Sequence, residues 1–498
     1  MKKIIVLLGA FNLAVLTVRA ILSYFLVTVT PFGIPQENEQ LFFNRLAEKL
    51  AFFGPAFQAL ISGNSIFRDP TYFTFAATTP LFISSVIFAA LLIILVRNRK
   101  GLTDDSLRSL YRWSIVFICV SALSFPVFAQ DFWLSIGWGR MTAAGVNPYY
   151  FDLSQEYTSG LPLDYTLGRM TYGPLWALIS GIVAWISGSN VLAAAVLFKL
   201  LLAGALVGSL ILIWELLDDY AVYYRCLGVA LFGWLPLTLT EFAADGHNDI
   251  VMVFFLLLWL YLLRKGRMTA ASVALAASVL IKYVTAPLFL LEILYFYYSL
   301  RRPLRTIVLP LAASGALMVA VTGLFFRSTE FFEAASTMRS WHFFTPQEAI
   351  ALVCRWIGLS GRLKYLPMLV FPLTSVYEGV RYFKLRTDDS FRLLVLAVMA
   401  TILFTAPGHI FPWYLLWVTP LCALLPSQPL SRWVIGAALA FPFALLPLQF
   451  SSLSGLMRWE LPGLLIFVFA FVWQFASAFW PFATAKVAES DLFAIPSS

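Results

Sequence analysis

Charge is scarce in this sequence: Asp, Glu, Lys and Arg make up only 12% of the 498 residues, which is about half the share found in soluble globular proteins. A soluble globular enzyme and a charged, disordered chain are therefore excluded. Cysteine is also rare, with only four in the chain, and this composition excludes a disulfide scaffold. No CxxC pair exists, so neither a zinc site nor a redox dithiol is indicated. We interpret the four isolated cysteines as small apolar packing residues: Cys119, Cys226, Cys354 and Cys422.

What the chain has in abundance is long apolar runs. Hydrophobic residues make up 60% of it, and the mean hydropathy is +0.83. A helix that spans a bilayer needs roughly 20 mostly apolar residues, and we count about fourteen candidate runs. The sequence therefore predicts an all-α polytopic membrane protein. The predicted spans are approximately 4–30, 73–96, 113–129, 191–216, 226–243, 250–264, 269–282, 284–299, 306–326, 366–383, 391–406, 412–426, 432–449 and 461–482.

The basic residues predict how these spans are oriented. A net charge of +8 would suggest nucleic-acid binding in a soluble protein, but here we expect Lys and Arg to mark cytoplasmic loops, and we expect no nucleic-acid partner. The N-terminus is placed in the cytoplasm, with the first apolar run retained as a span. Pro174–Ser187 must then lie along the outer surface, because counting it as a span would place Arg264–Arg267 outside. The basic clusters that fall inside are 97–112, 264–267, 301–305 and 381–392.

The outer side then receives the loops 31–72, 130–190 and 327–365 and the short segments 244–249 and 407–411. The first loop contains an amphipathic stretch, Leu41–Ile61, which we expect to lie in the membrane interface. Two groups of polar residues fall on this side, and such residues near hydrocarbon usually face the protein interior and are functional. They are the three histidines of the chain, His247, His342 and His409, and the carboxylates Asp131, Asp245 and Asp249.

Several short motifs, taken in order, resemble those of C-type glycosyltransferases, the GT-C fold, in the branch that depends on polyprenyl-phosphate mannose. They are Asp131-Phe132-Trp133 with Gly139-Arg140 and Gly145-Val146-Asn147-Pro148-Tyr149, then Tyr172-Gly173-Pro174-Leu175-Trp176, Gly246-His247-Asn248-Asp249, Leu280-Ile281-Lys282-Tyr283 and Phe411-Pro412-Trp413-Tyr414. The resemblance covers roughly residues 113–300 and, more weakly, extends to about 425. It implies a membrane enzyme that uses a lipid-phosphate sugar donor and has its active site on the outer face. The two spans before residue 113 depart from the shortest family pattern, in which the catalytic Asp follows the first span.

The resemblance implies that Asp131 is the catalytic general base. One carboxylate is sufficient, because a polyprenyl phosphate is already a good leaving group and needs no acid to protonate it. A base that deprotonates the acceptor hydroxyl on the opposite face of the sugar leads to inversion of the anomeric centre. The alternative interpretation is that Asp131 only caps the helix that follows it.

We expect Lys282 to neutralise the donor phosphate. The alternative interpretation is that its side chain only extends the amine to the membrane interface. Arg140, Arg169 or His409 would assist. The alternative for the two arginines is a surface ion pair with Asp152, Glu156 or Asp164.

The remaining candidates are predicted to bind the sugar or the acceptor: Asp245, His247, Asp249, Tyr172, Trp413 and His342. A helix through Asp245 and Asp249 would place both carboxylates on one face. They could instead hold Mg²⁺ or Mn²⁺, or Asp249 could serve only as an N-cap. No metal ligand is assigned.

These interpretations divide the chain into three parts. Residues 1–112 hold two spans and an outer amphipathic loop, 113–300 form a GT-C-like catalytic module with its first outer loop at 130–190, and 301–498 add spans whose outer loops contribute to the site. The resemblance implies an inverting transferase that moves a hexose, with mannose the best guess, to a glycolipid or glycan acceptor. No P-loop or dinucleotide fingerprint supports a nucleotide-sugar route. The alternatives are a secondary transporter and a lipid flippase or glycan ligase.

Overall fold

The computed structural model describes residues 1–26, 70–126, 129–161, 163, 168–326, 346–360, 362, 365, 367–405, 410–444 and a few positions between 465 and 473. Every regular element in these ranges is a helix, which confirms the predicted all-α class. The amphipathic stretch Leu41–Ile61 lies outside the described residues, as do Asp164, His342 and His409.

Most helices overlap a predicted apolar run, and α9 coincides with its predicted span. The helix at Asp104–Ala122 begins and ends several residues before the predicted 113–129, and the predicted spans 226–243 and 412–426 are each divided into two elements. The helices are α1 (Lys2–Leu26), α4 (Pro70–Arg97), η3 (Arg99–Gly101), α5 (Asp104–Ala122), α6 (Gln130–Ala143), α7 (Gln155–Thr158), α8 (Pro174–Ser187), α9 (Val191–Leu216), α10 (Val222–Gly233), η4 (Thr238–Asp245), α11 (Asp249–Arg264), α12 (Met268–Ile281), η5 (Tyr283–Thr285), α13 (Leu288–Tyr298), α14 (Leu304–Gly323), α16 (Pro346–Trp356), η8 (Pro367–Leu369), α17 (Val370–Leu385), α18 (Asp388–Thr405), η9 (Pro412–Trp417), α19 (Thr419–Leu424) and α20 (Pro429–Ala444).

Length and composition support a membrane protein. Among the described residues, four helices are long and apolar enough to cross a bilayer, namely α1, α4, α9 and α14. The pair α10 and η4 makes a fifth if its bend of 49° lies within one span. Other apolar helices, such as α8 and α12, are shorter; short helices suit positions that border a protein-enclosed cavity. The count of about fourteen spans stays a prediction.

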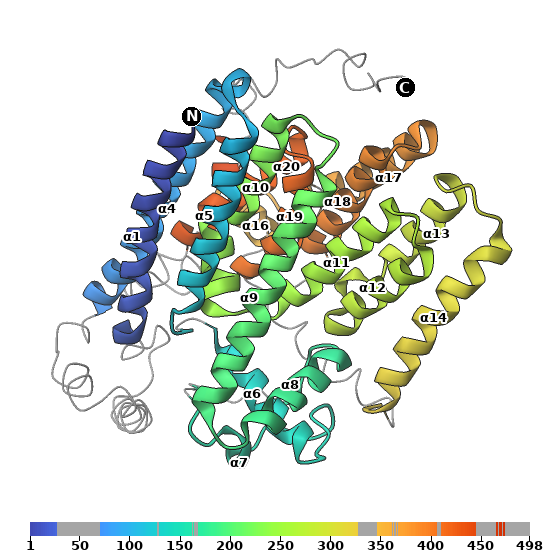
Figure 1. Ribbon diagram of the computed structural model, residues 1–498. Helices are drawn as coiled ribbons and strands as arrows, with labels where there is room; N and C mark the ends of the chain where they lie inside the picture. Colours follow the sequence, from blue (N-terminus) through green and yellow to red (C-terminus); the bar gives the residue numbers. More distant parts are fainter. Residues whose placement is uncertain are drawn as a thin grey trace.

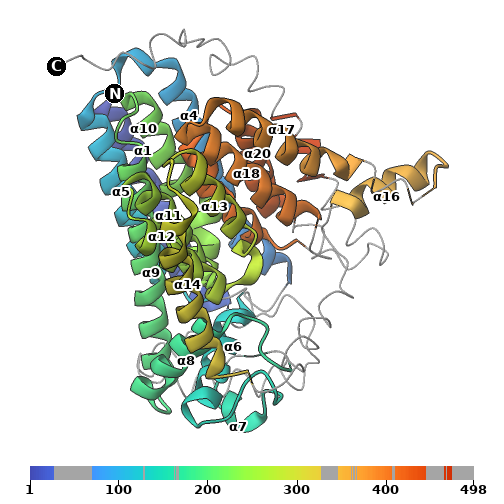
Figure 2. The same ribbon diagram turned by 90° about the vertical axis from the view of Figure 1, so that its right-hand side faces the viewer.

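The bundle has two distinct ends. Figure 1 shows α6, α7 and α8 together at one end and the N-terminus at the other, and Figure 2 shows the same arrangement from the side. α6 and α8 pack closely because both present glycines at their contact: a Cβ at Gly139 would collide with the carbonyl oxygen of Ser180, and one at Gly181 would lie 2.6 Å from Thr142. The segment Pro174–Ser187 is thus a short helix packed on α6.

Candidate active site

Asp131 lies in the first turn of α6. The N-cap of this helix is Ala129, so the Asp131 carboxylate is not its cap. One carboxylate oxygen lies 3.7 Å from Nδ1 of His247. The Asp131 side chain is 22% exposed and that of His247 only 1%, so a molecule that enters the site can reach the carboxylate but not the imidazole.

His247 lies between two carboxylates. Its Nε2 is 3.3 Å from Glu241 on the side away from Asp131, and its ring stacks on Trp413 with centroids 3.8 Å apart. Burial alone would lower the pKa of His247, but the two carboxylates outweigh it and raise that pKa to about 9. Burial would likewise raise the pKa of Asp131, yet His247, Tyr172 and Lys282 together lower it. At neutral pH the pair is therefore an imidazolium beside an ionised carboxylate.

A local break in the helices positions this histidine. η4 is a π-helical segment, a form that is rare and frequently found at functional sites. Its C-cap is Gly246, whose φ of +80° is a left-handed conformation that favours glycine. A Cβ at Gly246 would also lie only 2.8 Å from the ring of Phe132, the neighbour of Asp131. The break therefore brings the Gly246–Asp249 motif directly against the start of α6.

Lys282 forms a second charged pair beside the first. It is the C-cap residue of α12, and its amine donates a hydrogen bond of 2.6 Å to Asp249. The indole N–H of Trp417 donates to the same carboxylate oxygen. Three aromatic rings surround the amine, with centroids at 4.6 Å (Tyr414), 4.8 Å (Trp417) and 5.6 Å (Tyr172). Asp249 is the first residue of α11 and Asn248 its N-cap, so Asp249 does not serve only as a cap.

Tyr172 joins the two pairs. Burial, together with the nearby charges of Asp131 and Asp249, raises the pKa of its hydroxyl well above the usual value, so the hydroxyl stays protonated. Its neighbour Gly173 donates a backbone hydrogen bond of 2.9 Å to the carbonyl of Ile281, and a Cβ at Gly173 would collide with the Leu280 carbonyl. The motif that begins at Tyr172 is thus held against the end of α12, next to Lys282.

No helix runs through both Asp245 and Asp249, so the shared face that such a helix would create is not formed. Asp245 ends η4 and Asp249 begins α11, and the left-handed turn at Gly246 separates them. Each has its own cation: Asp245 lies 3.7 Å from Arg19, and Asp249 pairs with Lys282. Within the described ranges no group of three His, Cys, Asp or Glu side chains is arranged to hold a metal ion.

The two predicted arginines contact other groups. Arg140 donates to the backbone carbonyls of Tyr157, Ser159 and Ser189, at 3.1, 2.9 and 3.2 Å, and so ties the loop between α6 and α8 to the segment that follows α8. Arg169 lies 3.9 Å from Asp152. This is one of the surface ion pairs that the sequence offered as the alternative to phosphate binding. A role for either arginine in phosphate binding stays a prediction.

The site also contains charged residues that the sequence analysis did not single out. Glu241 faces His247, Arg19 of α1 faces Asp245, and Lys199 of α9 donates to the carbonyls of Ala243 and Ala244 in η4. All three are ionisable side chains within apolar runs. Such residues are costly in a membrane and usually functional, and this signal could have identified them.

A helical membrane protein with a carboxylate–histidine pair next to a lysine fits the class that the motifs indicate, the GT-C type of glycosyltransferase. Residues 54–297 match the family model described as alpha-(1->6)-mannopyranosyltransferase, N-terminal domain. The chain is also 23% identical, over 353 residues, to alpha-(1->6)-mannopyranosyltransferase A of Mycobacterium tuberculosis. That match covers 65% of this chain and 66% of the relative, slightly less than two thirds of its length. Both comparisons confirm the resemblance to GT-C type mannosyltransferases.

Proposed function

We propose that this protein transfers a mannosyl group from a polyprenyl-phosphate mannose to a hydroxyl of a glycolipid or glycan on the outer face of the membrane, forming an α-(1→6) linkage. The names of the matched family and relative support the sugar and the linkage. The observation that carries the proposal is the position of Asp131. It is an accessible, ionised carboxylate held by His247, and it shares a buried cluster with the cation Lys282.

Asp131 acts as the general base in this mechanism. It accepts the proton of the acceptor hydroxyl while the hydroxyl oxygen attacks the anomeric carbon. The bond from that carbon to the phosphate oxygen breaks, and its electron pair leaves with the polyprenyl phosphate. His247 is already protonated, because its pKa is raised to about 9. The histidine therefore orients the carboxylate, with Glu241 behind it, and is a positioning residue.

Lys282 stabilises the negative charge that grows on the departing phosphate. A lysine ammonium has three donors, and the hydrogen bond to Asp249 uses one of them. The amine itself lies among the rings of Tyr172, Tyr414 and Trp417. Aromatic walls exclude water, and a lower local dielectric strengthens the interaction between the amine and the phosphate.

The isoprenoid tail reaches the site from the lipid beside α8. This helix presents large apolar side chains that the protein leaves uncovered: Trp185 is 78% exposed, and Ile182 and Ile186 are about half exposed. Its other face packs on α6, where Trp176 donates a hydrogen bond of 3.0 Å to Ser135, one helical turn after Asp131. The helix therefore suits a lipid-facing wall for a donor whose head lies at the start of α6.

The experiment is sugar transfer by the purified full chain in detergent, with polyprenyl-phosphate [¹⁴C]mannose and a mannoside acceptor. Asp131→Asn should lower kcat by about 10²–10⁴-fold, the usual contribution of a general base. Glu156→Gln, which removes an exposed carboxylate from α7, serves as the matched control and should retain full activity. An Asp131→Asn variant with undiminished transfer would overturn the mechanism. Accumulation of uncleaved substrate in sealed vesicles would instead support transport, and consumption of a preassembled lipid-linked glycan as a block would support a ligase.

A further inference from the structure

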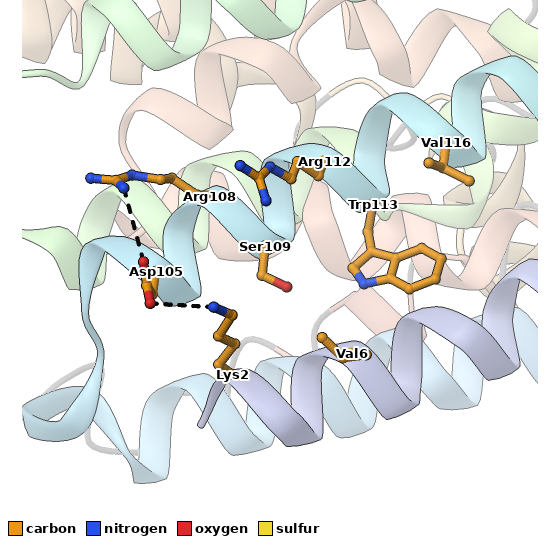
Figure 3. Close-up of a pocket in the computed structure, with 8 residues that line it drawn as sticks. All are labelled: Lys2, Val6, Asp105, Arg108, Ser109, Arg112, Trp113 and Val116. Atoms are coloured by element: carbon orange, nitrogen blue, oxygen red, sulfur yellow. Dashed lines mark hydrogen bonds and ion pairs between the residues drawn. The ribbon is translucent and has the colours of Figure 1, made fainter.

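A cavity of about 450 Å³ lies between α1 and α5, at the end of the bundle opposite α6, α7 and α8. Figure 3 shows the side chains that line it. They come from the first two turns of α1 and the first half of α5: Lys2, Val6, Asp105, Arg108, Ser109, Arg112, Trp113 and Val116. The cavity is remote from Asp131 and is not used by the proposed transfer reaction.

The polar side of the cavity carries an excess of positive charge. Asp105 bridges Lys2, at 3.3 Å, and Arg108, at 3.9 Å. Arg112 lies one helical turn beyond Arg108, is exposed, and forms no ion pair with any described residue. The lining therefore carries three cations and one carboxylate, a net charge of +2 that an anion of suitable size can neutralise.

The other side of the cavity is apolar. Val6 is 41% exposed and Val116 is 37% exposed, and both belong to helices of the bundle. Trp113 packs directly on Gly9, where any Cβ would lie 2.5 Å from its ring. This contact lets α1 and α5 approach closely, and the indole of Trp113 lines the cavity together with the cations and the valines. Tryptophan is typical of the boundary between headgroups and hydrocarbon.

We propose that this cavity binds the phosphate headgroup of an anionic phospholipid from the inner leaflet, with an acyl chain lying along Val6 and Val116. Charge complementarity favours an anion, and the apolar wall favours one that is attached to a lipid. The cavity lies among the basic segments predicted to face the cytoplasm, where an anionic leaflet attracts Lys and Arg. The bound lipid bridges α1 and α5, and so stabilises the helix that carries Arg19 to the active site.

The test is lipid binding by the delipidated full chain in detergent, measured by native mass spectrometry with phosphatidylglycerol. Each basic residue near an anionic lipid contributes about fivefold in affinity, so Arg108→Gln with Arg112→Gln should weaken binding about 30-fold. The matched control is Arg302→Gln with Arg305→Gln, which removes two exposed arginines from another basic segment that the sequence predicts to be cytoplasmic, and it should leave binding unchanged. Thermal unfolding without lipid verifies that both double variants fold.

Two further measurements separate this site from simpler explanations. Phosphatidylcholine should bind at least tenfold more weakly than phosphatidylglycerol, because it has no net charge; equal binding would overturn the proposal. Inorganic phosphate at millimolar concentration should not displace the lipid; displacement would show a site for soluble anions. If both double variants lost lipid affinity equally, the effect would be one of general surface charge, and the proposed site would be overturned. None of these outcomes depends on transferase activity, so the lipid site and the proposed function can fail separately.

Discussion

At the scale of single residues, the chemistry of this site rests on a histidine between two carboxylates. The imidazolium of His247, with help from Tyr172 and Lys282, lowers the pKa of the partly buried Asp131, since burial by itself would favour the protonated acid. Replacing His247 by Gln removes that positive charge while keeping a polar side chain. The pKa of Asp131 should then rise, and the acidic limb of the pH profile of kcat/KM should move upward by about one to three pH units. An unshifted limb would show that His247 does not act on the base.

The same histidine should make stability depend on pH. Its folded-state pKa of about 9 lies above the usual 6.5, so protonation of His247 stabilises the folded protein. This contribution is complete below about pH 6.5 and is lost as the pH rises through about 9, to an extent of roughly 3 kcal/mol. Thermal unfolding in detergent should show a melting temperature that falls over this range. In the His247→Gln variant that part of the fall should be absent; an identical decline in both proteins would contradict the assignment.

At the scale of elements, α1 is more than a membrane anchor. It lies outside the matched family region at 54–297, yet its Arg19 pairs with Asp245, which is only 2% exposed. Removing one partner of a buried ion pair takes away much of the compensation of the other charge, so Arg19→Met should destabilise the protein by up to about 3–5 kcal/mol. Adding Asp245→Asn to Arg19→Met should recover much of that loss. The melting temperatures of the single and the double variant measure this recovery. A double variant that is less stable than Arg19→Met would exclude the pairing.

The contact between the Tyr172 motif and α12 depends on a glycine. Gly173→Ala must push the motif away from the Leu280 carbonyl, and this moves Tyr172 relative to Lys282. We expect a loss of at least tenfold in kcat/KM, because small misplacements of a site can cost about 10²-fold. Gly315→Ala in α14 is the matched control, since nothing lies within 4 Å of the added Cβ. It should leave transfer unchanged, and similar losses in both variants would contradict this explanation.

At the scale of the whole molecule, the two ends of the bundle must face opposite sides of the membrane. Single cysteines at position 156 in α7 and at position 305 in α14 report on the two ends, in a background with the exposed native Cys119 replaced by Ser. An impermeant maleimide should label position 156 in intact cells and position 305 only after the membrane is permeabilised. The reverse pattern would place Asp131 on the cytoplasmic side and would overturn the proposed outer-face reaction.

Much of the architecture could be predicted from local sequence. Apolar run length predicts the helices, because a helix satisfies its own backbone hydrogen bonds inside the membrane, and this reasoning located α9, α11 and α14 to within a few residues. Asp131, His247 and Lys282 could be singled out because polar side chains are rare in such a chain. The resemblance to mannosyltransferases could be recognised from the same motifs and is confirmed by the comparisons.

The partners of those residues could not be predicted in this way. Pairs such as Arg19 with Asp245 and Lys282 with Asp249 join helices far apart in the chain, and the alternating hydropathy of a membrane protein contains no information on which spans are neighbours. The left-handed turn at Gly246, which separates Asp245 from Asp249, could not be predicted from the sequence either. The sequence alone determined that this is a helical membrane protein with a few charged side chains in apolar runs, where they are energetically unfavourable. Only tertiary packing decided which charges meet, because ion pairing acts over a few ångströms, and only the folded bundle sets distances that short.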